Sequence, residues 1–290
     1  NVATMENKGV ELELGYTKRL GDVNLNIRGN VSYLRNRVTF LGEGKKFLDG
    51  GQTVHAGAYP ISRIAVGQPI GAFYGFETLG IFQTQAEVNS YINKNGTPIQ
   101  PNAKPGDFKW ADLDGNGLIN ADDRTFIGDP TPNWTYGFTA NVSYKNFDLV
   151  LFGQGVAGND IYNGLRRLDI ATSNWTTAAL GRWTGPGTSN DFPRMTTSDD
   201  NHNFGNPSTF LLSDGAYFRI KNLQLGYTLP QSIVKKAGLQ KIRVYVSSGN
   251  LLTLTRYTGF DPEIGGASYG IDRGIYPQAR SFMAGLNVTL

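Results

Sequence analysis

The sequence has 290 residues, enough for one or two ordinary domains, and its hydrophobic fraction of 39% lies below the roughly 45–50% of soluble globular domains. The formal net charge is only +3 and no basic run is interleaved with aromatic residues, so nucleic-acid binding has little support. Cysteine is absent, which excludes disulfides and thiol chemistry. No stretch approaches the roughly 18 apolar residues of a membrane helix. If the chain spans a membrane, it therefore does so as a closed β-barrel.

The first two strands are predicted at roughly residues 7–19 and 22–37. In the second, Val23, Leu25 and Ile27 alternate with Asn24, Asn26 and Arg28. This period of two indicates a strand with one apolar and one polar face. Only the short Leu20-Gly21-Asp22 segment separates the two strands, which predicts a tight turn.

A long connection, residues 38–132, follows, and we expect it to be an extracellular loop with little apolar material per residue. Its segment 112–123 reads DLDGNGLINADD, which matches an EF-hand loop at positions 1, 3, 5 and 6 and has an acid at position 12. Oxygens at alternate positions converge on one cation there, while glycine permits the sharp turn. The alternative is an Asp/Gly-rich turn without metal, because position 12 is Asp instead of the usual Glu. We expect structural Ca²⁺, with Asp112, Asp114, Asn116, the Leu118 carbonyl and Asp123 as ligands.

Five more strands are predicted, at roughly 133–145, 146–155, 215–229, 240–254 and 278–290. Their lengths fit membrane barrel strands of about 10 residues, whereas strands of soluble sandwiches average about 5–6. Short and long connections alternate along the chain, which is typical of outer-membrane barrels with the long loops outside the cell. The sequence therefore predicts an all-β, antiparallel transmembrane β-barrel. Single-chain bacterial barrels have an even number of strands, whereas seven is odd, and the chain opens directly on a strand. We therefore expect a fragment of a larger barrel.

The alternation also predicts topology and faces. All strands are expected to pair with their neighbours in chain order, with a bulge near Asn222. Gly21, Asn146 and Ser232 are expected on the periplasmic side, and Asp112 and Trp183 outside. Lipid-facing side chains are expected at Leu25, Ile27, Phe138, Val244 and Leu286, and lumen-facing ones at Asn26, Arg28, Asn141, Arg243 and Asn287. Aromatic residues at the strand ends, namely Trp134, Tyr136, Tyr144 and Phe147, are expected to form interface girdles.

A second long loop, residues 155–214, is rich in aromatic and arginine side chains. Aromatic faces beside polar groups suit a sugar or a partner protein. The alternative is a small core that orders the loop. Ligand or partner contacts are expected at Trp175, Trp183, Arg182 and Arg194.

Catalysis has no support in the sequence. The two histidines, His55 and His202, are far apart and sit in no metal-binding spacing, and no GxSxG motif is present. Residues 153–158 satisfy GxGxxG, but no strand–helix–strand unit surrounds them. We expect the protein not to be an enzyme.

A set of short motifs runs in a fixed order along nearly the whole chain. These are NKGVE (7–11), GQPIGAFYGF (67–76), GIFQ (80–83), PGDFKWAD (105–112), DLDGNGLI (112–119), YFRIKNL (217–223), GYTLP (226–230), NLLTLT (250–255), YTGFDPE (257–263) and YP (276–277). As a set, they resemble the C-terminal half of the SusC/RagA family of TonB-dependent outer-membrane transporters.

The resemblance implies that residues 1–290 are the C-terminal portion of a 22-stranded barrel with an N-terminal plug, in a Bacteroidetes-type outer membrane. It implies active import of glycan or peptide oligomers, powered by TonB-ExbB-ExbD, with a SusD-like surface lipoprotein as lid. The chain departs from the family pattern because it has no plug or TonB-box region, and because it ends in Leu290 where the family usually has an aromatic. The rival functions are a non-transporting surface adhesin or scaffold barrel and a soluble carbohydrate-binding β-sandwich.

Overall fold

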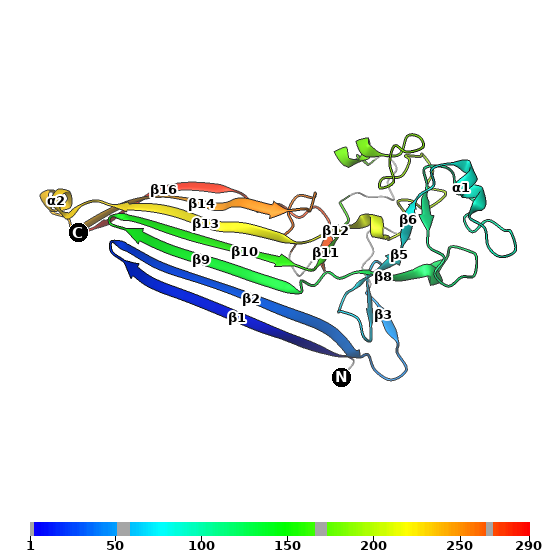
Figure 1. Ribbon diagram of the computed structural model, residues 1–290, viewed down its shortest axis with the longest axis horizontal. Helices are drawn as coiled ribbons and strands as arrows, with labels where there is room; N and C mark the ends of the chain where they lie inside the picture. Colours follow the sequence, from blue (N-terminus) through cyan, green and yellow to red (C-terminus); the bar gives the residue numbers. More distant parts are fainter. Residues whose placement is uncertain (1–2, 51–58, 166–172, 265–268) are drawn as a thin grey trace.

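The computed structural model describes residues 3–50, 59–165, 173–264 and 269–290. Its main body is a seven-stranded antiparallel sheet in which each strand pairs with its neighbours in chain order (Figure 1). This arrangement confirms the predicted strand number and topology. The strands are β1 (Thr4–Leu20), β2 (Val23–Phe40), β9 (Trp134–Tyr144), β10 (Phe147–Ala157), β13 (Tyr217–Thr228), β14 (Lys241–Thr255) and β16 (Ser281–Thr289).

Tight turns set the register at one end of the sheet. Gly21 (φ 60°) and Lys145 (φ 53°) take left-handed backbone conformations in the connections β1–β2 and β9–β10. Such conformations match the twist of a short antiparallel hairpin. The predicted bulge is present, because the pairing of β13 with both neighbours shifts beside Asn222. We call this end of the sheet the short-turn end.

The short-turn end also carries a compact helical connection between β13 and β14. It consists of α2 (Gln231–Val234) and the 3-10 turn η4 (Lys235–Ala237), and Gly238 (φ 71°) ends it in the left-handed conformation that glycine tolerates. The other helical elements are α1 (Gln85–Ser90), η1 (Ala121–Asp123), η2 (Thr177–Gly181) and η3 (Thr209–Leu211). None of the helices in the described ranges is long and apolar enough to cross a membrane.

The long connections fold together at the opposite end of the sheet, into what we call the loop assembly (Figure 1). It contains three two-stranded sheets, and a three-stranded one in which β11 lies between β12 and β15. Its strands are β3 (Phe47–Asp49), β4 (Arg63–Ala65), β5 (Phe73–Phe76), β6 (Thr78–Ile81), β7 (Phe108–Trp110), β8 (Arg124–Gly128), β11 (Asp160–Asn163), β12 (Leu212–Asp214) and β15 (Ile271–Asp272).

The expectation that residues 38–132 hold little apolar material is wrong. Phe76, Ile81, Phe108 and Trp110 form a fully buried cluster in this segment, and partly buried side chains from the 155–214 loop pack on it. The period-two pattern did not reveal this core because its strands are only three to five residues long. The long loops are thus ordered by hydrophobic burial as well as by turns.

Candidate functional site

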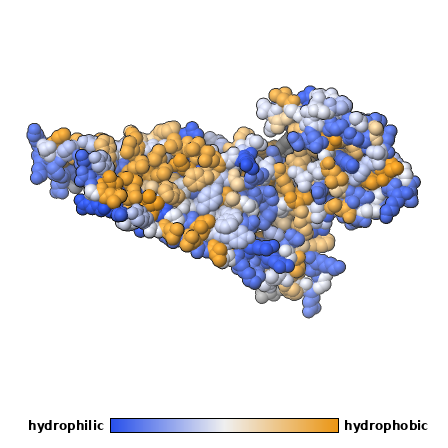
Figure 2. All heavy atoms as spheres, viewed as in Figure 1, coloured by the Kyte–Doolittle hydropathy of each residue, from blue (hydrophilic) through white to orange (hydrophobic). Residues whose placement is uncertain are grey.

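The seven-stranded sheet has one apolar face and one polar face. Cross-strand partners of the apolar face include Leu25 with Val142, and Val244 with both Tyr227 and Leu286. On the polar face Asn26 lies opposite Asn141, and Arg243 opposite Asn287. The predicted division of residues between the faces is therefore confirmed. Figure 2 shows the apolar residues gathered over the strands. Many are well exposed, for example Val10 (72%), Leu14 (65%) and Leu286 (60%).

Aromatic side chains mark both ends of the apolar face. Tyr33 and Trp134 pack with ring centroids 4.7 Å apart at the loop end, and Phe147 and Tyr227 do the same at the short-turn end. Strand β9 runs for 11 residues, from Trp134 to Tyr144. At about 3.3 Å per residue and a tilt of roughly 40°, it spans about 25 Å, the height of the apolar band in outer-membrane barrels.

Tyr136, another of the expected interface aromatics, packs on the neighbouring strands. Its ring covers Gly155, where a Cβ would come within 2.7 Å of it, and it stacks on Phe218 at 6.1 Å. Its hydroxyl donates to the Tyr217 carbonyl. The ring thus fills space over a glycine of the neighbouring strand.

Residues 112–123 bring three carboxylates together between β7 and η1. Ligand oxygens of Asp112, Asp114 and Asp123 lie within 4.8 Å of one another. Asp112 accepts hydrogen bonds from the backbone N–H groups of Gly115 and Gly117, at 2.9 Å each. The chain therefore curls around the carboxylate, with both glycines at positive φ (70° and 83°).

Asp123 closes this loop from its other end. It is fully buried and accepts from the backbone N–H groups of Leu113 and Asn120, each at 2.8 Å. The bond from Asn120 completes a capping box at the start of η1. Asn116 donates to the Asp114 carboxylate at 2.7 Å. The turn is thus pre-formed by its own hydrogen bonds.

The carboxylate cluster fits a cation ligated by oxygen. No salt bridge recorded among the described residues involves Asp112, Asp114 or Asp123. A buried carboxylate costs free energy when it lacks a compensating positive charge. Carboxylates, an amide oxygen and a backbone carbonyl are ligands that Ca²⁺ prefers. The geometry can hold such an ion, with Asn116 and the Leu118 carbonyl as the remaining expected ligands.

Two of the expected contact residues, Trp183 and Arg194, are engaged inside the loop assembly. Arg194 pairs with the fully buried Asp107 through Nε–Oδ1 (2.6 Å) and Nη2–Oδ2 (3.0 Å). The Trp183 indole packs over Gly106 and donates to Gln83 at 3.1 Å. These contacts order the loop, which is the alternative that the sequence left open.

The other two, Trp175 and Arg182, line a groove of about 440 Å³ on the loop assembly, together with Leu180 and Met195. Trp175 also joins an aromatic cluster, at 4.7 Å from the ring of Phe204. Leu180 is 78% exposed at the rim. A ligand or partner role for Trp175 and Arg182 stays a prediction.

A buried charge cluster on the polar face was missed at the sequence level. Arg219 donates to Asp261 at 2.6 Å and to Glu263 at 2.7 Å, and Lys221 also reaches Glu263 at 2.7 Å. One signal in the sequence could have suggested this cluster. The two cations, Arg219 and Lys221, are two residues apart, and so are the two acids, Asp261 and Glu263. The cluster joins the connection between β14 and β15 to strand β13.

Among the described residues, neither His202 nor the GxGxxG segment belongs to a catalytic arrangement. His202 lies in a turn (φ 53°) where its backbone N–H donates to Asp199, and His55 lies outside the described residues. The GxGxxG segment begins within strand β10 and ends in the turn at Gly158. It therefore belongs to a strand exit and not to a phosphate-binding loop.

Comparison with known proteins finds relatives along nearly the whole chain. No protein-family model matches the chain. The chain is 34% identical over 299 residues to TonB-dependent receptor P3 of Formosa agariphila, and 23% identical over 298 residues to TonB-dependent receptor SusC of Bacteroides thetaiotaomicron. These alignments cover 99% of this chain but only 29% and 27% of the relatives. The chain thus spans about three tenths of the length of its relatives.

Solved structures give the same result. The RagAB peptide importer in its open-open state matches all of this chain with a TM-score of 0.75 and 27% identity, over 29% of its own chain. The closed-closed state matches with a TM-score of 0.74. The resemblance to the SusC/RagA type and the β-barrel fold expected from the sequence are therefore confirmed. These relatives carry the names of receptors and transporters, not of enzymes, as expected.

Proposed function

On the premise that this chain is homologous to the SusC/RagA-type TonB-dependent receptors, we propose that it forms part of the wall of an outer-membrane β-barrel that imports nutrients. The observation that carries the proposal is the exposed apolar face, about 25 Å high between its aromatic ends. A soluble β-sandwich would bury that face against a second sheet. The long connections all meet at one end of the strands, as expected for loops outside the cell.

The wall is completed by further strands. Strands β1 and β16 are the two edges of the seven-stranded sheet, and each pairs on one side only within the described ranges. An unpaired strand edge is not tolerated in the hydrocarbon region of a membrane. The relatives are about three times as long as the chain, so they contain enough sequence for a larger, 22-stranded barrel.

The names of the relatives support a proposal for the cargo and the partners. RagAB is named a peptide importer, which favours peptide oligomers over glycans for this chain. Import would be powered by TonB-ExbB-ExbD through segments outside this chain. A SusD-like surface lipoprotein would dock on the loop assembly, where Trp175 and Arg182 line an open groove.

We further propose that residues 112–123 bind one structural Ca²⁺. Flexible coordination by oxygen ligands suits calcium better than magnesium, which demands a stricter octahedron and retains its waters. Asp112, Asp114 and Asp123 supply the charge, and the pre-formed turn lowers the entropy cost of assembling the ligands. The ion would rigidify the loop assembly where the lipoprotein docks.

Cysteine labelling on intact cells tests the membrane arrangement. Leu180→Cys in the loop assembly and Asn146→Cys at the short-turn end each introduce one reporter into this cysteine-free segment, and any cysteine elsewhere in the receptor is first replaced by serine. In the full-length receptor, a membrane-impermeant maleimide is expected to label position 180 and to label position 146 only after the outer membrane is opened. Labelling of position 146 from outside, without labelling of position 180, would contradict the proposal.

Uptake of labelled peptide and glycan oligomers by the same cells tests the cargo class. Strains with and without the receptor, and with and without TonB, are compared. TonB-dependent uptake of peptides alone is the expected result. TonB-dependent uptake of glycans alone would reassign the cargo, and uptake of neither would favour a non-transporting surface barrel.

A further inference from the structure

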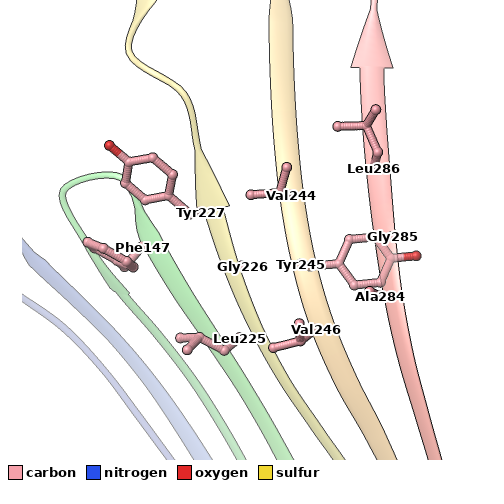
Figure 3. Close-up of a pocket in the computed structure, with 10 residues that line it drawn as sticks. All are labelled: Phe147, Leu225, Gly226, Tyr227, Val244, Tyr245, Val246, Ala284, Gly285 and Leu286. Carbon is pink, nitrogen blue, oxygen red and sulfur yellow. The ribbon is translucent and has the colours of Figure 1, made fainter.

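The apolar face is hollowed at the short-turn end. A groove of about 550 Å³ lies across strands β10, β13, β14 and β16. Figure 3 shows the side chains that surround it. Its apolar walls are formed by Phe147, Leu225, Tyr227, Val244, Val246 and Leu286.

Two neighbouring rows of residues explain the hollow. In one row Tyr227, Val244 and Leu286 pair side by side, and in the next Leu225 and Val246 pair with the small Ala284. Tyr245 and Gly285 lie in the row between these two, and their row points to the polar face. The Tyr245 ring covers Gly285 on that face, and a Cβ added to Gly285 would lie 2.3 Å from the ring. The floor of the groove is therefore largely backbone, with an opening above Ala284.

Three exposed lysines lie in connections at the same short-turn end of the sheet as the groove. Lys145 occupies the turn before Phe147, and Lys235 and Lys236 occupy the connection between β13 and β14. All three side chains are exposed. Figure 2 shows this tip of the molecule as hydrophilic.

Acidic side chains do not neutralise these lysines. The carboxylates nearest in sequence to the described turns at this end are Asp22, in the β1–β2 turn, and Asp148. Asp148 lies on the polar face, where it pairs with Arg243. None of the three lysines forms a salt bridge within the described part of the chain.

An exposed apolar residue adds to this arrangement. Ile233 lies on α2, two residues before Lys235, and is 54% exposed. An apolar side chain next to lysines is the pattern of a segment that lies at a membrane surface. The turn between β13 and β14 thus presents Ile233 and the lysine pair at the edge of the apolar band.

We infer that this groove and the three lysines form a binding site for one anionic glycerophospholipid of the leaflet that faces the short turns. The acyl chain would lie over Ala284, between Leu225 and Leu286, and the headgroup phosphate would meet Lys145, Lys235 and Lys236. The charge complementarity selects an anionic over a zwitterionic headgroup. This inference rests on the proposed function, because it requires the apolar face to lie in a bilayer.

Each lysine near an anionic membrane surface contributes about 1 kcal/mol, so affinity falls roughly fivefold for each lysine that is neutralised. The groove adds the burial of apolar chain surface, which also stabilises the bound lipid. Filling the groove weakens binding of every phospholipid, whereas removing the lysines weakens binding of anionic ones only. The two halves of the site are therefore separable by mutation.

The experiment uses the full-length receptor in nanodiscs that contain phosphatidylcholine with a small fraction of phosphatidylglycerol. The receptor is then transferred to detergent, and native mass spectrometry counts the lipids that remain bound. Wild type is expected to retain one phosphatidylglycerol. The triple variant Lys145→Gln, Lys235→Gln, Lys236→Gln is expected to bind it about a hundredfold more weakly. Ala284→Trp is expected to abolish retention of both lipids. The matched control replaces Lys45, Lys94 and Lys104 of the loop assembly with Gln and is expected to behave as wild type.

Equal retention of phosphatidylglycerol by wild type and the lysine variant, or equal retention of both lipids by wild type, would overturn the inference. Heat-modifiable migration in gels verifies that each variant is folded, and the lysine variant decides the question if Ala284→Trp fails to fold. A receptor that stays monodisperse without detergent and retains no lipid would contradict the proposed function itself. Failure of the lipid-site inference and failure of the proposed function thus give different results.

Discussion

Arg219 and Asp261 form a nearly solvent-free ion pair that joins the polar face of the sheet to the connection between β14 and β15. The Nη2–Oδ1 distance is 2.6 Å, and the two side chains are only 3% and 4% exposed. Arg219 also bonds Thr253 and Glu263, while Asp261 accepts from the backbone N–H groups of Glu263 and Gln278. The pair thus holds this connection against the wall of the sheet, and through Gln278 it also ties down the segment between β15 and β16.

Removal of one partner of this pair should loosen the connection. Asp261→Asn leaves the Arg219 charge buried and unpaired, which costs about 3–5 kcal/mol when a buried pair is broken. Hydrogen exchange of residues 257–264 in the full-length receptor should accelerate, while strand β2 keeps its protection. Arg256→Gln, an exposed neighbour, serves as the control and should change little. Unchanged exchange in Asp261→Asn would show that the connection is held by other contacts.

The same connection should respond to acid. Burial acts to raise the pKa of Asp261, but hydrogen bonds from Arg219 and from the amides of Gln278 and Glu263 outweigh it and hold the pKa below its usual value. A depressed carboxyl pKa contributes stability that is present above the ordinary pKa of about 3.9 and is lost as the pH falls through the lower folded-state pKa. Protection of residues 257–264 should therefore stay constant from pH 8 to about 5 and decline below about pH 4. A decline centred near neutral pH would indicate a different group.

Sequence periodicity predicted the seven strands well because each is long and one-sided. Strands such as β2 and β9 carry one apolar residue in every two, and the bulge at Asn222 interrupts that pattern visibly. The clustering of Asp112, Asp114 and Asp123 was equally predictable, because these carboxylates are close in sequence. Both features depend on local spacing.

The loop assembly could not be predicted, because its contacts join residues that are distant in sequence. Asp107 meets Arg194 across 87 residues, and Arg219 meets Asp261 across 42. Nothing in local spacing pairs these charges, and the short strands β5 to β8 are below the length at which alternation is informative. Trp183 and Arg194 therefore looked available for ligands, although the structure uses them to order the loop.

The two faces of the sheet should tolerate charge differently. Phe138 lies on the apolar face near the middle of β9, and Asn141 lies on the polar face of the same strand. Arg on the lipid side near the bilayer midplane costs about 2–4 kcal/mol. Phe138→Arg should therefore lower the free energy of unfolding in bilayers by about that amount, and Asn141→Arg should change it by much less. Equal costs, measured by urea titration in lipid vesicles, would contradict the assignment of the faces.

Calcium should protect residues 100–130 from proteolysis. The ion would tie Asp112, Asp114 and Asp123 together in the middle of a long connection, so chelation is expected to expose this segment to protease and Asp114→Ala to mimic chelation. Affinity should be modest, near the 10⁻⁴–10⁻³ M of extracellular calcium modules. Asp122→Asn is the matched control, because that acid lies in η1 outside the ligand set and should leave protection and its calcium dependence intact. If neither chelator nor Asp114→Ala changes cleavage, and isothermal titration of the full-length receptor detects no Ca²⁺ binding that Asp114→Ala abolishes, the three carboxylates only brace a turn through their backbone hydrogen bonds.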